Sequence, residues 1–141
     1  NNIKINKNSF LKKELIRPTK IYTKEIMGLN RKRLIKVCAN ITGGGLRDNI
    51  SRVIQKGLCA EIDLGKIKTL KIFSWIKKFN ITDEEMIKTF NCGVGFCIII
   101  NKNNLNKISK FFNPKFKPYV IGKIIKEKKP VILNGKINWG K

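Results

Sequence analysis

Three consecutive glycines at residues 43–45 stand between an apolar run and a helical pattern. No other stretch constrains the fold as much. The run before them, residues 34–38 (Leu-Ile-Lys-Val-Cys), is typical of a buried strand. The apolar residues after them recur with the spacing of one helix face: Leu46, Ile50, Val53 and Ile54. The pattern therefore predicts a helix over about 46–55 and places the glycines where a strand turns into a helix.

This junction has two interpretations. Glycines let the backbone approach a ligand, and the free amides at a helix start attract phosphate; the ligand contacts would then be Thr42, Gly43, Gly44 and Gly45. Alternatively, the glycines only allow the dihedral angles of a tight turn. The segment matches neither the Walker pattern nor the dinucleotide fingerprint, so the motif alone leaves both interpretations open.

Length and composition indicate one globular domain. The chain has 141 residues with 42% hydrophobic content, enough to bury a sizeable core. No apolar run approaches the ~20 residues of a membrane span, and no signal peptide is visible, so we expect no membrane association. The four cysteines lack metal-site spacing and the chain has no histidine, so we do not expect a zinc site. We expect the thiols to be free and the protein to be cytoplasmic. The start at Asn1, without Met, suggests a fragment.

The formal charge of +22 also has two interpretations. One is a basic module that binds RNA or another polyanion. The other is a drift of the sequence toward Lys, Asn and Ile, which the scatter of basic residues through every segment favours. No RNA-binding motif with interleaved aromatic residues is present. We therefore expect weak attraction of anions and no specific nucleic-acid binding, and keep the polyanion-binding module as the alternative.

Periodicity and turn signals predict the order of elements. Residues 1–14 read as a linker or disordered lead-in, and residues 15–141 as one domain. Extended or strand segments are expected at 15–22, 34–38, 58–64, 96–100, 119–125 and 131–133. Helices are expected at 24–30, 46–55, 70–79, 83–90 and 104–112. The order is mostly strand–helix–strand, which predicts an α/β (α+β) layered sandwich with helices on a mixed β-sheet.

Four details of this pattern are specific enough to test. The helix after Thr82 begins with a capping box, in which Glu85 reaches back to the cap. The run 96–100 is apolar throughout, which predicts an interior strand covered on both faces. The basic turn between the last two strands predicts that they form a hairpin. In the helix over 70–79 we expect Leu70, Phe73 and Ile76 to face inward.

Four segments together resemble one enzyme family, aminoimidazole ribonucleotide synthetase (phosphoribosylformylglycinamidine cyclo-ligase). Residues 39–45 with 49–53 resemble its A-H-I-T-G-G-G … E-N-I-P-R-V segment, and residues 17–22 resemble its P-T-R-I-Y segment. Residues 84–95 resemble E-E-M-x-x-T-F-N-C-G-V-G, and residues 119–122 resemble A-Y-V-I-G. One such motif would be weak, but four in the family's order are highly specific.

The resemblance covers only the carboxy-terminal half of that enzyme and implies the fold of its carboxy-terminal domain. It implies an enzyme of purine biosynthesis that closes formylglycinamidine ribonucleotide into aminoimidazole ribonucleotide. The γ-phosphoryl group of ATP activates the formyl oxygen, the amidine nitrogen attacks, and phosphate leaves. ATP and Mg²⁺ would be held mainly by the absent amino-terminal half, and the complete enzyme would be a homodimer. Alone, this chain would be inactive, because it supplies one wall of the cleft between the halves.

The resemblance also implies site residues, although it supplies no metal ligands here. The phosphate of the ribonucleotide would lie at Thr42 and the glycines 43–45. Three further groups of residues would line the site or the interdomain cleft: Arg52; Asn91, Cys92 and Gly93; and Arg17, Thr19 and Tyr22. No histidine is available to activate Cys92, so we do not expect it to be a nucleophile.

One position departs from the family pattern and leaves the catalytic residue unknown. Asn40 stands where the family has histidine before Ile-Thr-Gly-Gly-Gly. Asparagine keeps a hydrogen bond but cannot carry a proton near neutral pH. If the family's histidine only orients substrate, Asn40 can replace it. If it transfers a proton, the chain would instead be a non-catalytic relative that binds a phosphorylated ligand.

Overall fold

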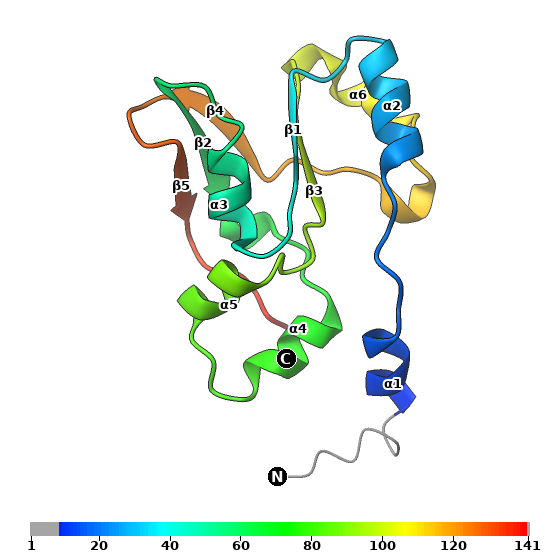
Figure 1. Cartoon of the computed structure of the whole chain (residues 1–141), viewed down its shortest axis with the longest axis vertical. Helices are drawn as coiled ribbons and strands as arrows, with labels where there is room; N and C mark the ends of the chain where they lie inside the picture. The colour runs from blue at the N-terminus through cyan, green and yellow to red at the C-terminus, as the bar shows by residue number, and fades with distance from the viewer. Residues whose placement is uncertain (1–8, 141) are drawn as a thin grey trace.

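The computed structural model describes residues 9–140, which form helices around two small β-sheets (Figure 1). The strands are β1 (Val37–Asn40), β2 (Leu58–Asp63), β3 (Phe96–Ile99), β4 (Gly122–Lys126) and β5 (Val131–Asn134). The α-helices are α1 (Ser9–Leu15), α2 (Thr23–Arg31), α3 (Gly45–Ser51), α4 (Lys71–Lys77), α5 (Asp83–Thr89) and α6 (Leu105–Ser109). Short 3-10 turns cover Leu64–Lys66, Lys102–Asn104 and Pro114–Phe116. Helices packed on a mixed sheet confirm the predicted fold class.

The central strand of the larger sheet is β2. It pairs antiparallel with β4, with Ala60 opposite Ile124, and parallel with β5, with Ala60 opposite Val131. The predicted hairpin between the last two strands is therefore wrong, because β4 and β5 lie on opposite sides of β2. The connection 127–130 is long enough, at about 3.3–3.6 Å per residue, to cross the end of β2. The amide of Ala60 donates to the carbonyl of Pro130 at 2.9 Å, and this bond fixes the end of the connection to β2.

The strand predicted to be interior, β3, has a different environment from the one we expected. Within residues 9–140 it pairs with β1 alone, antiparallel, with Ala39 opposite Cys97. All four of its residues are half-buried rather than buried. The apolar run correctly predicted a strand. The number of strands beside it depends on segments distant in sequence, and the apolar pattern of one segment does not predict that number.

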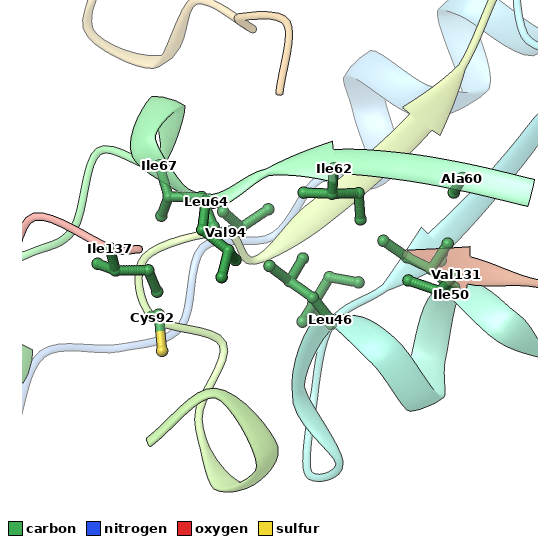
Figure 2. Packing of buried hydrophobic residues seen from close by; sticks show 12 residues of the cluster. Leu46, Ile50, Ala60, Ile62, Leu64, Ile67, Cys92, Val94, Val131 and Ile137 are labelled. Carbon is green, nitrogen blue, oxygen red and sulfur yellow. The ribbon is translucent and has the colours of Figure 1, made fainter. Parts of the chain in front are cut away.

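The core forms where α3 packs against the larger sheet. Figure 2 shows Leu46 and Ile50 of α3 pointing toward Ile62 of β2 and Val131 of β5. All four are at most 5% exposed, and burying each such side chain stabilises the fold by roughly 1.5–3 kcal/mol. Leu46 and Ile50 of the predicted apolar face are therefore confirmed, whereas Val53 and Ile54 lie beyond the helix and are partly buried against the same core. The helix itself ends at Ser51, earlier than the predicted residue 55.

The predictions for the start of α5 and for the inward face of α4 were only partly right. Thr82 caps α5 as predicted, because its hydroxyl accepts from the amide of Glu85 at 3.2 Å. The carboxylate of Glu85 instead accepts from the hydroxyl of Thr89 at 2.8 Å, so the reciprocal half of the capping box is not formed. Leu70 was predicted to face inward but is 45% exposed, since the helix α4 starts one residue later.

Both ends of the described chain are ordered by packing. The helix α1 covers residues 9–14 of the predicted linker or disordered lead-in, and its Leu11 is 1% exposed, so these residues are helical and not disordered. Residues 1–8 lie outside the described part. Near the other end, Ile137 is 4% exposed and the indole of Trp139 donates to the carboxylate of Asp83 at 3.0 Å. None of the helices within residues 9–140 has the length and apolar character needed to cross a membrane.

Candidate functional site

The glycine loop joins β1 to α3, as the sequence predicted. Gly44 and Gly45 have φ angles of 90° and 60°, which favour glycine. A Cβ atom at Gly45 would collide with the carbonyl oxygen of Ile87 at the end of α5. At Gly43, by contrast, a Cβ atom would meet nothing within 4 Å. Packing and dihedral angles therefore explain the second and third glycines, while the first faces open space.

A buried amide side chain organises this loop. Asn49 is 6% exposed, and its Nδ2 donates to the carbonyl oxygens of Gly45 at 2.8 Å, Gly43 at 3.2 Å and Thr42 at 3.4 Å. The hydroxyl of Thr42 donates to its Oδ1 at 3.3 Å. Sequence reasoning missed this role, although Asn49 lies three residues after Leu46 and so on the buried helix face. These bonds hold the loop against the middle of α3.

The backbone amides of the loop are not equally available to a ligand. The amide of Gly45 donates to the carbonyl of Thr42 at 3.1 Å, and Gly45 is buried. Thr42 and Gly43 are exposed. A Cβ atom at Gly44 would lie 2.9 Å from the carboxylate oxygen Oδ2 of Asp48, so a negative group already neighbours that residue. An anion would therefore meet the loop most easily at Thr42 and Gly43.

The turn 91–95 lies directly beside the glycine loop. The amide of Ile41 donates to the carbonyl of Gly95 at 3.0 Å, and Gly45 packs against the carbonyl of Phe90. Within the turn, the side-chain oxygen of Asn91 accepts from the amide of Gly93 at 3.0 Å. The structure thus brings together two segments that lie about fifty residues apart in sequence.

Cys92 is part of this turn but is not accessible for chemistry. Its side chain is 1% exposed, and its thiol donates to the carbonyl of Met86 at 3.4 Å. Burial raises the pKa of this thiol to about 11, with a smaller contribution from the charge of Asp83. A thiol that stays protonated at neutral pH is a poor nucleophile. The side chain therefore acts as a buried apolar group.

Tyr22 lies at the end of the two-stranded β1–β3 ribbon where the glycine loop and the turn 91–95 also lie. Its ring centroid lies 5.2 Å from that of Phe96, and its hydroxyl lies beside Gly95, where any side chain would collide with it. Burial raises the pKa of Tyr22, with smaller contributions from Cys97 and Glu25. In the β1–β3 register, Asn40 lies opposite Phe96 and is exposed. Parts of three of the four segments that resemble the family therefore converge here.

Three of the predicted site residues do not join this cluster. Arg52 is exposed and caps the far end of α3, about 10 Å along the helix axis from the glycine loop at 1.5 Å per residue. Arg17 and Thr19 are exposed in the segment before α2. The guanidinium of Arg17 pairs with Glu14 at 3.5 Å. An exposed ion pair of this kind contributes little to stability.

Sequence reasoning also missed Lys20. Its ammonium nitrogen lies 4.0 Å from the ring centroid of Phe116 and 5.2 Å from that of Tyr22, and it pairs with Glu25 at 3.3 Å. Such contacts hold a cation over aromatic faces. The sequence showed only a lysine within an extended stretch, and Phe116 is too distant in sequence to suggest the contact.

No metal centre is formed by the part of the chain that the structure describes. Within residues 9–140, no group of three or more His, Cys, Asp or Glu side chains could hold a metal ion. The chemistry available at the cluster is instead hydrogen bonding from Thr42, Asn40 and exposed backbone amides. This donor set suits an uncharged or anionic oxygen-rich ligand.

The fold and this cluster define an α+β domain with a glycine loop at the end of a two-stranded ribbon. Residues 3–133 match the family described as "AIR synthase related protein, C-terminal domain", and the chain belongs to this family. It is 39% identical over 118 residues to a phosphoribosylformylglycinamidine cyclo-ligase of Streptococcus agalactiae, covering 83% of this chain and 34% of that protein.

Two further relatives support the same family membership. A phosphoribosylformylglycinamidine cyclo-ligase of Thermodesulfovibrio yellowstonii is 39% identical over 121 residues, which is 84% of this chain and 35% of that protein. A "Trifunctional purine biosynthetic protein adenosine-3" of Chironomus tentans is 43% identical over 116 residues, 82% of this chain and 8% of that protein. The chain thus spans about a third of the length of the two cyclo-ligases. The predicted family resemblance is confirmed.

Proposed function

We propose that this chain is the carboxy-terminal part of an ATP-dependent cyclo-ligase that converts formylglycinamidine ribonucleotide into aminoimidazole ribonucleotide. The observation that carries the proposal is the convergence of Tyr22, the glycine loop 42–45 and the turn 91–95 at one end of the β1–β3 ribbon. Segments that resemble the enzyme family would need to meet in space to form one wall of a cleft. The cyclo-ligases that this chain resembles supply the name of the reaction.

Within the proposed site, the ribonucleotide phosphate contacts Thr42 and Gly43. These two residues are exposed, and their backbone amides suit an oxyanion. The Thr42 hydroxyl, which in this structure donates to Asn49 Oδ1, would turn from Asn49 to donate to the phosphate. Gly44 and Gly45 fix the loop geometry around them. Asn91 and Gly93 form the neighbouring turn, and Cys92 anchors it from within. Arg52 would reach the substrate only from the far end of α3, so we assign it a peripheral contact.

The remaining parts of the site come from outside this chain in the proposal. ATP and Mg²⁺ are bound mainly by the amino-terminal half, since the described residues offer no cluster of metal ligands. Tyr22, Thr19 and Arg17 face the cleft between the halves. The complete enzyme is a cytoplasmic homodimer. The domain is residues 15–141, with the residues before it acting as a linker to the other half.

Asn40 decides whether the proposed enzyme is active. It is exposed at the end of β1 beside Phe96, where a side chain can reach a bound ligand. Its amide can orient a substrate oxygen or amidine group but cannot accept and release a proton near pH 7. We propose an orienting role, and the non-catalytic relative that binds a phosphorylated ligand is the competing outcome.

The test is to join this chain to the amino-terminal part of the Streptococcus agalactiae cyclo-ligase that it does not match. Purified fusion protein, given formylglycinamidine ribonucleotide, ATP and Mg²⁺, should release ADP and form aminoimidazole ribonucleotide, while the chain alone should not. A matched fusion with Asn40→His separates the two outcomes. Turnover only with Asn40→His would assign this chain to the non-catalytic relatives, and no turnover in either fusion would contradict the proposal.

A further inference from the structure

An apolar groove separates the two sheets. It has a volume of about 610 Å³ and is lined by β3 on one side and by β4 with the residues before it on the other. Ile98 and Ile99 line the groove from the first side, and Val120, Gly122 and Ile124 line it from the second. Ile50 of α3 and Ile108 of α6 also line it. The groove therefore lies between two sheets and also between two helices.

Each strand beside the groove has an unpaired edge in the described part of the chain. The amide of Ile41 donates to Gly95 at 3.0 Å, so the alternation of an antiparallel pair turns the amide and carbonyl of Phe96 and Ile98 away from β1. On the other side, the amide of Asp63 donates to Ile121 at 2.8 Å. The same alternation turns the backbone groups of Gly122 and Ile124 away from β2. Neither β3 nor β4 has a second partner strand within residues 9–140.

The groove also exposes apolar surface that an interior strand would bury. Val120 is 51% exposed and Ile124 is 37% exposed, while every residue of β3 is half-buried. Exposed strand edges with free backbone groups are the surfaces to which an additional strand binds. Four lysines line the same groove. Two of them, Lys20 and Lys68, hold their ammonium groups over aromatic rings, at 4.0 Å from Phe116 and 4.9 Å from Tyr119.

We propose that the groove accepts an extended apolar segment from the amino-terminal part of the cyclo-ligase polypeptide. This segment pairs with the free edges of β3 and β4 and joins the two sheets into one. The proposal rests on the proposed function. The occupant follows from length, because the chain spans only 34–35% of the two cyclo-ligases and the remaining polypeptide would be held nearby at high effective concentration. The two lysines favour acidic residues beside the inserted segment.

Cys38 provides a reporter for this site. It is the exposed one of the four cysteines, and it lines the groove. Cys59 and Cys92 are buried, and burial raises the pKa of Cys97 to about 12, so all three should react slowly with a thiol reagent. A segment bound in the groove should cover Cys38 and slow its modification.

The experiment adds overlapping peptides of about 12 residues, long enough for one strand, to the 141-residue chain. The peptides cover the part of the Streptococcus agalactiae cyclo-ligase that this chain does not match. One peptide should slow modification of Cys38 about tenfold and protect the amides of Ile98 and Ile124 from hydrogen exchange. If no peptide does both, or if ATP alone gives the same protection, the proposal is wrong.

Matched variants locate the contact. Ile124→Lys places a charge in the groove and should weaken binding of the peptide by at least about tenfold. Ile124→Pro removes the outward-facing amide without breaking a bond to β2, and it also replaces the isoleucine side chain, so it should weaken binding as well. Ile16→Lys changes an isoleucine that is 74% exposed and does not line the groove, and should have no effect. Equal binding by all three variants, each shown to be folded by circular dichroism, would contradict the proposal.

The outcomes separate this proposal from the proposed function. A fusion that turns over substrate while Cys38 stays fully reactive and Ile124→Lys has no effect would overturn the groove proposal alone. A peptide that protects both edges, in a chain whose fusions never turn over, would overturn the enzymatic proposal and support the groove. Concentration-dependent dimers of the chain that protect Ile98 without any peptide would identify a second copy as the occupant and overturn the proposal.

Discussion

The side-chain amide of Asn49 donates to the carbonyl oxygen of Gly45 at 2.8 Å, and this bond is buried. It links the middle of α3 to the loop that begins it. Because the same nitrogen also reaches Gly43 and Thr42, one side chain holds the whole glycine loop against the helix. The shape of the proposed ligand contact therefore depends on a residue that would not itself touch the ligand.

Replacing Asn49 should destabilise the chain. Asn49→Ala removes the bonds to Thr42, Gly43 and Gly45, of which the one to Gly45 is buried, and the loss of a buried hydrogen bond costs about 1–3 kcal/mol. Urea denaturation should show a lower midpoint with an unchanged slope. Arg47→Ala, at an exposed position two residues earlier, is the matched control and should change stability by less than about 0.5 kcal/mol. Equal midpoints for Asn49→Ala and Arg47→Ala would show that the bonds do not stabilise the loop.

The three glycines should differ in their tolerance of alanine. Gly45→Ala forces a Cβ atom into the carbonyl of Ile87 at a φ of 60° and should cost more than about 3 kcal/mol, or prevent folding. Gly43→Ala meets nothing within 4 Å and should change stability by less than about 1 kcal/mol. Thermal unfolding of the two variants provides the comparison. Similar effects at both positions would contradict the packing described for this loop.

The buried thiols should make the fold less stable at alkaline pH. Burial raises the pKa of Cys92 to about 11 and that of Cys97 to about 12, whereas an unfolded thiol has a pKa of about 8.5. Above about pH 8.5 the unfolded chain loses these protons first, so the free energy of unfolding falls as pH rises toward 11–12. The loss is at most about 1.4 kcal/mol per pH unit for each thiol.

Denaturation midpoints between pH 7 and 10 test this pH dependence. Cys97→Ala should show a smaller fall than the unchanged chain, and Cys38→Ala, at an exposed position, should show the same fall. Tyr22, whose pKa is raised by burial, adds a loss of the same sign only above about pH 10. A midpoint that does not change up to pH 10 would contradict the desolvation of these two thiols.

The surplus of positive charge should give weak binding to polyanions and no sequence preference. With a net charge of +22, the chain should bind unstructured RNA in low salt and lose that binding by ~150 mM salt, where charges are screened beyond about 8 Å. Fluorescence anisotropy with two unrelated RNA sequences measures this. Retained, sequence-dependent binding at physiological salt would instead favour the basic nucleic-acid module.

The sequence predicted local features well where one segment determines them. The apolar face of α3, the position of the glycine loop and the cap at Thr82 all follow from residues within a few positions of one another, and the structure confirms them. These features depend on backbone dihedral angles and helix periodicity, which are short-range properties.

Features that depend on distant segments could not be predicted in the same way. The hairpin between β4 and β5 was wrong because β2, about sixty residues earlier, lies between them. The contact of Lys20 with Phe116 likewise joins segments almost a hundred residues apart. The role of Asn49 could have been found, because a polar residue on a buried helix face needs a hydrogen-bond partner.

The central claim is that the exposed part of the glycine loop binds the phosphate of the substrate, and Thr42 tests it most directly. In the fusion enzyme, Thr42→Val removes the hydroxyl at nearly constant shape, while Thr42→Ser keeps it. A hydrogen bond to a charged group contributes about 1.5–3 kcal/mol, so we predict that Thr42→Val raises the KM for formylglycinamidine ribonucleotide at least about tenfold and that Thr42→Ser stays close to the parent. An unchanged KM in Thr42→Val would contradict phosphate binding at this loop.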